Sequence, residues 1–203
     1  MILPPRLSII MASQKPRAVI LRRGPSKWFH VILWDTAKDT FEYGAWFKGR
    51  IYEERCSLSP DGALFLYFAL QGNKWGTSYE GAWTAVSRPP WLFALTLWPQ
   101  GDTWGGGGCF IGNRELILET GHLRAHPSHP CRGLNVKLGH CSKNSENSLA
   151  SFGEWAGLDH SGYEIYTHKG KLFRKLKHGD KKLADFNDLK PEPKEAPKWA
   201  KKL

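Results

Sequence analysis

The sequence predicts a mainly β protein, and three observations support this prediction. Short runs rich in aromatic and β-branched residues recur along the chain, and such residues favour strands. Turn-forming groups of Gly, Pro, Asp and Ser separate these runs. No long segment repeats its apolar residues with the 3.6-residue period of an amphipathic helix. The 203 residues are therefore expected to form one β domain with tails.

The first group of candidate strands lies in the N-terminal third of the chain. It comprises residues 18–21, 28–34, 40–47, 50–58 and 64–70. The tetrapeptide Ser59-Pro60-Asp61-Gly62 predicts a turn between the last two, because Pro presets φ, Asp hydrogen-bonds its own backbone and Gly accepts a positive φ.

Two further groups follow. The second comprises residues 81–87, 91–98, 109–111 and 115–118. Residues 91–98 are strongly apolar and fit a strand or a short buried helix, while the last two runs are expected to pair across Gly112-Asn113. In the third group, residues 163–167 and 171–176 flank His168-Lys169-Gly170 and predict the clearest hairpin in the chain.

The remaining segments have the composition of tails and loops. Residues 1–15 are expected to be a disordered extension, and residues 16–185 a single mainly β domain. Within that domain, residues 119–153 are rich in His, Pro, Gly, Ser and Asn and predict a long surface loop. Residues 186–203 are rich in Pro and Lys and are expected either to lie over the surface or to stay mobile.

Composition excludes a membrane-spanning protein. The longest apolar run has eight residues, far fewer than the ~18 of a spanning helix. The first ten residues lack an apolar stretch followed by a cleavage site, so no signal peptide is expected and the predicted location is cytoplasmic. In that compartment free thiols are expected for all four cysteines, Cys56, Cys109, Cys131 and Cys141.

The net charge of +10 is unevenly distributed. Residues 1–50 carry a net charge of +6, residues 51–160 a net charge of −2, and residues 161–203 a net charge of +6. Two basic ends therefore flank a nearly neutral middle, which also holds most of the ten Trp. Basic ends indicate an acidic partner such as nucleic acid, or solubilising ends around an apolar core.

One combination of motifs recurs. A strand ends in Leu33-Trp34-Asp35, the Ser59-Pro60-Asp61-Gly62 turn follows some 25 residues later, and Asp159-His160-Ser161-Gly162 precedes the predicted hairpin. Residues 30–68 and 155–176 thus resemble the repeats of WD40-type and TolB-type β-propeller proteins. The resemblance implies an incomplete propeller-like stack of antiparallel sheets, about three blades long, with a small β-barrel or twisted sheet as the alternative. About three blades are too few to close a ring, so the resemblance also implies that a protein partner or a second copy covers the open edges.

The histidine-rich loop offers a candidate metal site. Six imidazole or thiol donors lie within 20 residues, and both groups are good zinc ligands. Their spacing matches no common zinc finger, so a polar loop without a cofactor is the leading interpretation and a zinc site is the alternative. The candidate ligands are His122, His126, His129, Cys131, His140 and Cys141.

The segment that precedes Cys109 holds four consecutive glycines beside Trp104. It lacks the Gly-Lys-Ser or Gly-Lys-Thr of a phosphate-binding loop, so a bend between packed strands is expected. Exposed aromatic and charged residues around this bend form the candidate partner-binding surface. That surface comprises Trp75, Arg88, Asp102, Trp104 and Gly105.

The leading hypothesis is a non-enzymatic module that binds another macromolecule, most often a protein in propeller-like folds. One alternative is a nucleic-acid-binding protein that uses its basic ends and exposed aromatics. The candidate nucleic-acid contacts are Arg22, Arg23, Lys171, Arg174, Lys175 and Lys177. The other alternative is a zinc-dependent module or enzyme built on the histidine-rich loop.

Overall fold

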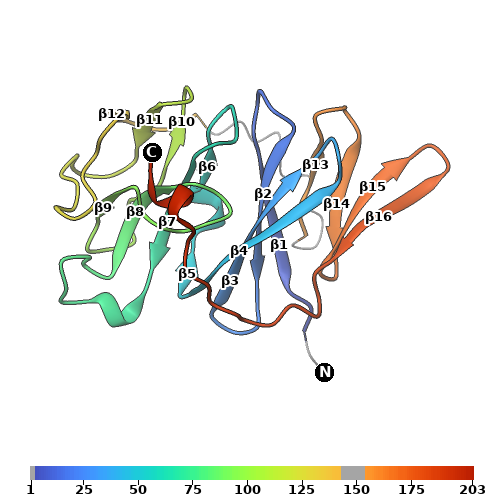
Figure 1. Cartoon of the computed structure of the whole chain (residues 1–203), viewed down its shortest axis with the longest axis horizontal. Coiled ribbons are helices and arrows are strands. Elements are labelled where there is room, and N and C mark those ends of the chain that lie inside the picture. The colour runs from blue at the N-terminus through green and yellow to red at the C-terminus, as the bar shows by residue number, and fades with distance from the viewer. Residues whose placement is uncertain (1–2, 143–153) are drawn as a thin grey trace.

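The chain forms four β-sheets that stack side by side (Figure 1). The computed structural model describes residues 3–142 and 154–203. From one end of the stack to the other, the sheets are β13–β16, β1–β4, β5–β9 and β10–β12. No sheet in these ranges closes on itself, so the predicted stack of antiparallel sheets is confirmed and the barrel alternative is wrong.

The β1–β4 sheet is an antiparallel meander. Its strands are β1 (Arg6–Met11), β2 (Arg17–Arg23), β3 (Trp28–Asp35) and β4 (Thr40–Lys48). The last three agree with the predicted strands. β1 corrects the expectation that residues 1–15 are disordered: it pairs with β2 along its length, and Leu7 and Ile9 are buried in the core.

The β5–β9 sheet is less regular. It contains β5 (Arg50–Ile51), β6 (Ser57–Leu58), β7 (Phe65–Leu70), β8 (Ala82–Ser87) and β9 (Thr96–Pro99). The single strand predicted over residues 50–58 is wrong, because the 3-10 turn η1 (Glu53–Arg55) divides it. A second 3-10 turn, η2 (Gly72–Lys74), lies between β7 and β8. In the apolar run 91–98, only the end from Thr96 onward joins the sheet.

The β10–β12 sheet closes one end of the stack. The hairpin predicted across Gly112-Asn113 is confirmed as β10 (Gly108–Phe110) and β11 (Glu115–Leu118). The third strand, β12 (Asn135–Leu138), runs parallel to β11 and lies within the region expected to be a surface loop. Pairing with β11 orders that part of the loop. Residues 143–153 of the same region lie outside the described residues.

The β13–β16 sheet forms the other end of the stack. It contains β13 (Ala156–Leu158), β14 (Glu164–His168), β15 (Lys171–Leu176) and β16 (Gly179–Asp185), and the predicted β14–β15 hairpin is confirmed. The tail then runs back along the stack to the 3-10 turn η4 (Lys198–Lys201), where Ala200 is fully buried (Figure 1). The tail therefore lies over the surface, one of its two predicted states. None of the helical turns that the structure describes could span a membrane.

Each seam between neighbouring sheets has its own hydrophobic core. Ile20, Trp34 and Leu172 belong to the seam between β1–β4 and β13–β16. Val31 and Phe65 belong to the seam between β1–β4 and β5–β9. The third core, between β5–β9 and β10–β12, is formed by Leu64, Leu66, Val86, Trp98, Leu116 and Leu118. Trp34, Trp83 and Trp98 are buried in these cores, whereas Trp75 and Trp104 are exposed.

The two turns that carry the propeller resemblance share a hydrogen-bonding pattern. The N–H of Gly62 donates to the carbonyl of Ser59 at 2.8 Å, and the N–H of Gly162 donates to the carbonyl of Asp159 at 2.9 Å. Both glycines have positive φ, +70° and +79°. In each turn the first residue is buried, and its side-chain oxygen accepts backbone N–H groups in the turn or directly after it. The kinship with propeller families stays a prediction.

Candidate functional site

The loop between β9 and β10 presents most of the predicted partner-binding surface. It carries Asp102, Trp104 and Gly105, and the Trp104 side chain is 94% exposed. The carboxylate of Asp102 accepts the backbone N–H of Trp104 at 2.9 Å. An indole this exposed contributes almost nothing to the core of its own chain.

Arg55 holds the backbone of this loop in place. Its Nη1 donates to the carbonyls of Thr103 and Gly105, at 2.9 and 2.7 Å. The guanidinium lies 5.2 Å from the ring centroid of Tyr52 and 5.3 Å from that of Phe68, within the range of cation–π attraction. The peptide units on both sides of Trp104 are therefore fixed while its side chain projects into water.

The glycines that follow Trp104 are required by close packing. Gly106 and Gly107 have φ values of +98° and +88°, which disfavour residues that carry a Cβ. A Cβ at Gly106 would lie 2.3 Å from the ring of Phe68, and one at Gly107 would lie 2.5 Å from the carbonyl oxygen of Arg55. This agrees with the interpretation of the glycines as a bend between packed strands.

A pocket of about 670 Å³ lies beside this loop. Its wall includes the carboxylate residues Glu54, Asp102 and Glu119, together with Arg55 and His140. Glu119 Oε1 accepts the backbone N–H of Cys141 at 2.9 Å. Sequence reasoning did not place Glu54 or Glu119 at this surface, because nothing in their local sequence indicates that η1 and the segment after β11 meet the glycine bend.

Trp75 lies at the same end of the sheet as this loop. Its side chain is 49% exposed, and its ring covers Gly81, where a Cβ would lie 2.3 Å away from a ring carbon. Gly81 directly precedes β8, and the backbone N–H of Gln100, just after β9, donates to the carbonyl of Ala82. Since β8 and β9 are antiparallel, both tryptophans project from one end of the sheet.

Arg88 does not belong to this surface, which corrects the predicted set. It directly follows β8 at the opposite end of the strand, and its Nε donates to the carbonyl of Lys202 in the tail. Three of the five predicted residues, Asp102, Trp104 and Gly105, therefore line one pocket, and Trp75 lies at the same end of the sheet. We refer to Trp75, Asp102, Trp104, Gly105 and the pocket beside them as the Trp104 surface.

Both ring nitrogens of His126 are hydrogen-bonded to neighbours within the chain. Its Nδ1 accepts the backbone N–H of Ser128 at 3.2 Å, so the ring proton of the neutral form lies on Nε2, which donates to Ser78 Oγ at 2.8 Å. Burial, and then the proximity of His129, lower the pKa of His126 and favour that neutral form. In this tautomer the imidazole cannot accept a proton from Ser78, so the pair is not an activated nucleophile.

His129 is saturated in the same way. Its Nδ1 lies 2.8 Å from the carbonyl of Ala94, so Nδ1 carries the proton and Nε2 accepts the hydroxyl of Tyr79 at 3.3 Å. Both ring nitrogens are therefore engaged. The predicted neighbours His126 and His129 do lie together, with ring centroids 5.6 Å apart, but their lone pairs face groups of the chain itself.

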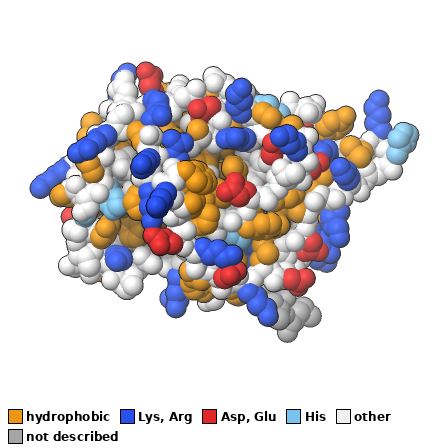
Figure 2. Space-filling model, viewed as in Figure 1, with side chains coloured by type: hydrophobic (Ala, Val, Ile, Leu, Met, Phe, Trp, Pro, Cys, Tyr) orange, Lys and Arg blue, Asp and Glu red, His pale blue; other side chains and the backbone are white. Residues whose placement is uncertain are grey.

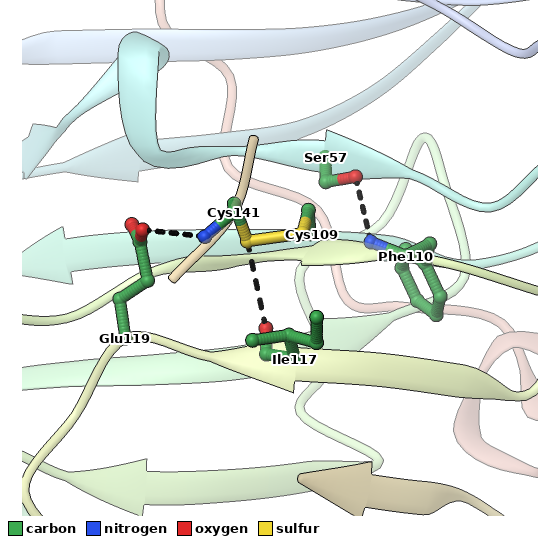
Figure 3. Close-up of a disulfide and its surroundings, with 6 residues drawn as sticks. All are labelled: Ser57, Cys109, Phe110, Ile117, Glu119 and Cys141. Carbon is green, nitrogen blue, oxygen red and sulfur yellow. Dashed lines mark hydrogen bonds between the residues drawn. A yellow bond between two sulfur atoms is a disulfide. The ribbon is translucent and has the colours of Figure 1, made fainter. Parts of the chain in front are cut away.

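Cys141 forms a disulfide with Cys109, which corrects the expectation of four free thiols (Figure 3). Cys109 lies in β10 opposite Ile117 of β11, and Cys141 follows β12 on the other side of that strand. The segment after β12 returns to β11, where Cys141 Sγ lies 4.0 Å from the carbonyl oxygen of Ile117. The two Cα atoms are therefore 5.9 Å apart, although 32 residues separate them in sequence. Disulfides persist mainly in oxidising compartments, so the cytoplasmic location stays a prediction.

The remaining candidate zinc ligands do not converge. Cys141 is removed from the set by its disulfide, and burial raises the pKa of the Cys131 thiol, which disfavours the thiolate that binds metal. His122 and His140 are exposed. In the described ranges, no group of three or more His, Cys, Asp or Glu is arranged to hold a metal ion.

Two of the predicted nucleic-acid contacts serve the fold instead. Arg22 is 2% exposed and donates to the carbonyls of Gly24, Phe186, Asn187 and Leu189, so it fastens the start of the tail to β2. Arg174 is bound by two carboxylates. Neither guanidinium is available to a phosphate.

The other four predicted contacts remain at or near the surface. Lys171 pairs with Asp185 and Lys175 pairs with Glu164, while Lys177 is exposed and Arg23 lies over the ring of Phe29. Figure 2 shows Lys and Arg side chains spread over the visible face among hydrophobic and acidic ones, not gathered in one patch.

A larger cavity, of about 1180 Å³, lies at the seam between the β1–β4 and β13–β16 sheets. Its lining mixes basic Arg23 and Lys190 with acidic Glu154 and Asp188. The Glu154 carboxylate is already bound by His168 and by the backbone N–H of Lys169. In this lining, Glu154 and Arg22 therefore already bind groups of the chain itself.

Comparisons with known protein families, with curated proteins and with solved structures found no match to this chain.

Proposed function

We propose that this protein is a non-enzymatic binding module that recognises another protein through the Trp104 surface. One observation carries the proposal: the Trp104 indole is 94% exposed, although its backbone is fixed on both sides by Arg55. A flexible loop could expose an indole at random, but a fixed loop presents it in one place. Tryptophans presented in this way are enriched among the residues that dominate binding energy at protein interfaces.

The neighbourhood of Trp104 supports the same function. Trp75 adds a second half-exposed indole at this end of the sheet, and the adjacent pocket can receive a side chain of the partner. Binding centres typically combine aromatic anchors with a recess of this kind.

Affinity capture with the purified protein tests the proposal. The wild-type chain and Trp104→Ala are immobilised, exposed to lysate of the source cells, and their bound proteins compared by mass spectrometry. Trp199→Ala is the matched control, since Trp199 is 52% exposed but lies on the tail. We expect Trp104→Ala to lose a specific partner that Trp199→Ala retains.

Equal capture by all three proteins would refute the proposal. Sedimentation of wild type and Trp104→Ala, run alongside, distinguishes the partner from a second copy of this chain. A dimer that the substitution dissociates would show that the partner is the chain itself.

A further inference from the structure

We infer that the Trp104 pocket receives a cationic side chain, Lys or Arg, from the protein partner. The inference rests on the proposed function and adds the chemistry of the group that is bound. It follows from the acceptors in the pocket wall, from the indole at its rim and from the charge of the rest of the molecule.

Carboxylates supply the first part of the argument. Asp102 and Glu119 each use one oxygen to accept a backbone N–H, of Trp104 and of Cys141 respectively. Within the described chain no bond is made to the other oxygen of either group. Glu54 adds a third carboxylate to the wall. A ligand that carries N–H donors and positive charge complements such a wall.

Two uncharged oxygens point to the same chemistry. Gln100 Oε1 and Thr120 Oγ1 are buried and have no hydrogen-bond partner among the described residues, and both residues line this pocket. Polar oxygens buried without a partner are rare in native proteins. Both oxygens are shielded from solvent in this structure, so a ligand reaches them only when the pocket opens around it. An ammonium or guanidinium group that enters in this way carries several donors for them.

The Trp104 indole offers a cation-binding surface beside these acceptors. The face of an indole is the aromatic surface that attracts Lys and Arg most strongly, and this one stands in water at the rim of the pocket. The nearby cation, Arg55, is engaged elsewhere: its Nη1 is bound to two loop carbonyls, and its plane lies against Tyr52 and Phe68. No ion pair joins it to Asp102 or Glu119 in the described residues.

The charge of the whole molecule makes the inference specific. At a net charge of +10, the protein repels cationic peptides in general and attracts anionic ones. Affinity for a cationic peptide must therefore come from a local acidic site. A neutral oligosaccharide also stacks on an exposed Trp, and the experiment includes it as a competing outcome.

Fluorescence anisotropy with defined probes tests the inference. The probes are fluorescein-labelled peptides of repeated Gly-Ser-Lys, Gly-Ser-Gln and Gly-Ser-Glu, with chitohexaose as an unlabelled competitor. We expect the Lys peptide to bind with an affinity that falls as salt rises. Trp104→Ala should weaken that binding about tenfold, which corresponds to a well-placed cation–π contact.

Charge-neutral variants isolate the carboxylates. Asp102→Asn and Glu119→Gln each keep the oxygen that accepts a backbone N–H, so the loop stays in place while the charge is lost. We expect the double variant to weaken the Lys peptide at least as much as Trp104→Ala does, and to flatten the salt dependence. Glu192→Gln, on the exposed tail, is the matched control and should leave the affinity unchanged.

The outcomes separate this inference from the proposed function. If Trp104→Ala abolishes partner capture but the Lys peptide does not bind, or binds equally to the double variant, the inference is overturned and the proposed function stands. Binding of chitohexaose with no binding of the Lys peptide also overturns the inference. If Trp104→Ala changes neither capture nor peptide binding, both fail.

Discussion

Arg174 and Asp39 form a two-point ion pair across the seam between the β13–β16 and β1–β4 sheets. Nη1 of Arg174 donates to Oδ2 of Asp39 at 2.7 Å, and Nη2 donates to Oδ1 at 2.9 Å. Nε of the same guanidinium donates to Asp159 at 2.8 Å, in the turn before β14. Burial alone would lower the pKa of Arg174, but the bonds and charges of Asp39 and Asp159 together raise it. One side chain thus joins turns of two sheets.

Replacing Arg174 by Met is expected to destabilise the protein by about 3 kcal/mol, because it removes the cation that binds both Asp39 and Asp159 in a largely buried place. The exposed Lys181, 3.4 Å from Asp39, remains as a weaker partner of that carboxylate alone. Chemical denaturation with urea measures the change. Lys175→Met is the matched control: its ion pair with Glu164 is exposed, so about 0.5 kcal/mol or less is expected. Similar losses of unfolding free energy in the two variants would show that the Arg174 bridge stabilises the protein no more than an exposed ion pair does.

This bridge also shows what the sequence conceals. In sequence, Arg174 is one of several basic residues near the C-terminus and indicates an acidic partner outside the chain. Its actual partner, Asp39, is 135 residues away, and only the packing of the two sheets brings them together. Net charge and local clustering cannot distinguish a cation that binds a ligand from one that joins two turns.

Strands were predictable where local chemistry and tertiary packing agree. The β14–β15 hairpin and the Ser59–Gly62 turn follow from turn residues and from apolar side chains that the core then buries. β16 was missed because it is a polar edge strand with little apolar alternation. β12 was missed because its partner is a parallel neighbour whose position depends on a long connection.

Gly107→Ala is expected to destabilise the protein by about 2 kcal/mol or more. The residue has a φ of +88°, and the added Cβ would lie 2.5 Å from a backbone oxygen that cannot move away freely. Gly121→Ala is the matched control, since no atom lies within 4 Å of its Cβ position. Thermal unfolding compares the two variants. An unfolding temperature of Gly107→Ala equal to that of wild type would contradict the role given to the bend.

His30 is expected to make stability fall in mild acid. Its ring is 3% exposed and stacks on Trp46 at 4.1 Å, and burial, followed by the charge of Arg22, lowers the pKa of His30 to about 4. Between pH 6.5 and 4 the unfolded chain then binds a proton at this residue that the folded chain does not bind. Stability contributed by neutral His30 is full above pH 6.5 and falls by up to about 3 kcal/mol by pH 4.

Urea unfolding at several pH values checks this dependence. His30→Phe keeps an aromatic ring against Trp46 but cannot be protonated, so its stability should fall less than that of wild type between pH 6.5 and 4. If the free energies of unfolding of wild type and His30→Phe fall by the same amount over this range, another group causes the acid sensitivity.

The candidate site was only half visible in the sequence. Trp104 and its glycine bend could be recognised from composition, because four glycines beside an aromatic residue indicate a tight bend with one large side chain. Glu54 and Glu119 carry no such mark, and they reach the pocket only because η1 and β11 pack beside the bend. The histidine-rich loop shows the opposite case, in which the sequence indicated a site that the structure does not form. Neighbouring groups within the chain already bind the imidazoles of His126 and His129.

The Cys109–Cys141 disulfide is expected to stabilise the protein by about 3 kcal/mol, because it closes a loop between residues 32 apart in sequence. The double variant Cys109→Ser/Cys141→Ser should unfold at a lower urea concentration, with a free energy of unfolding smaller by that amount. Added reductant should lower the urea midpoint of wild type but not that of the variant. Cys56→Ser is the control, because Cys56 is outside the disulfide. Thiol titration in denaturant should count two thiols in oxidised wild type and four after reduction. Four thiols without reductant would show that the two cysteines are not joined, and the β10–β12 sheet would then depend on strand pairing and on the core around Leu116 and Leu118.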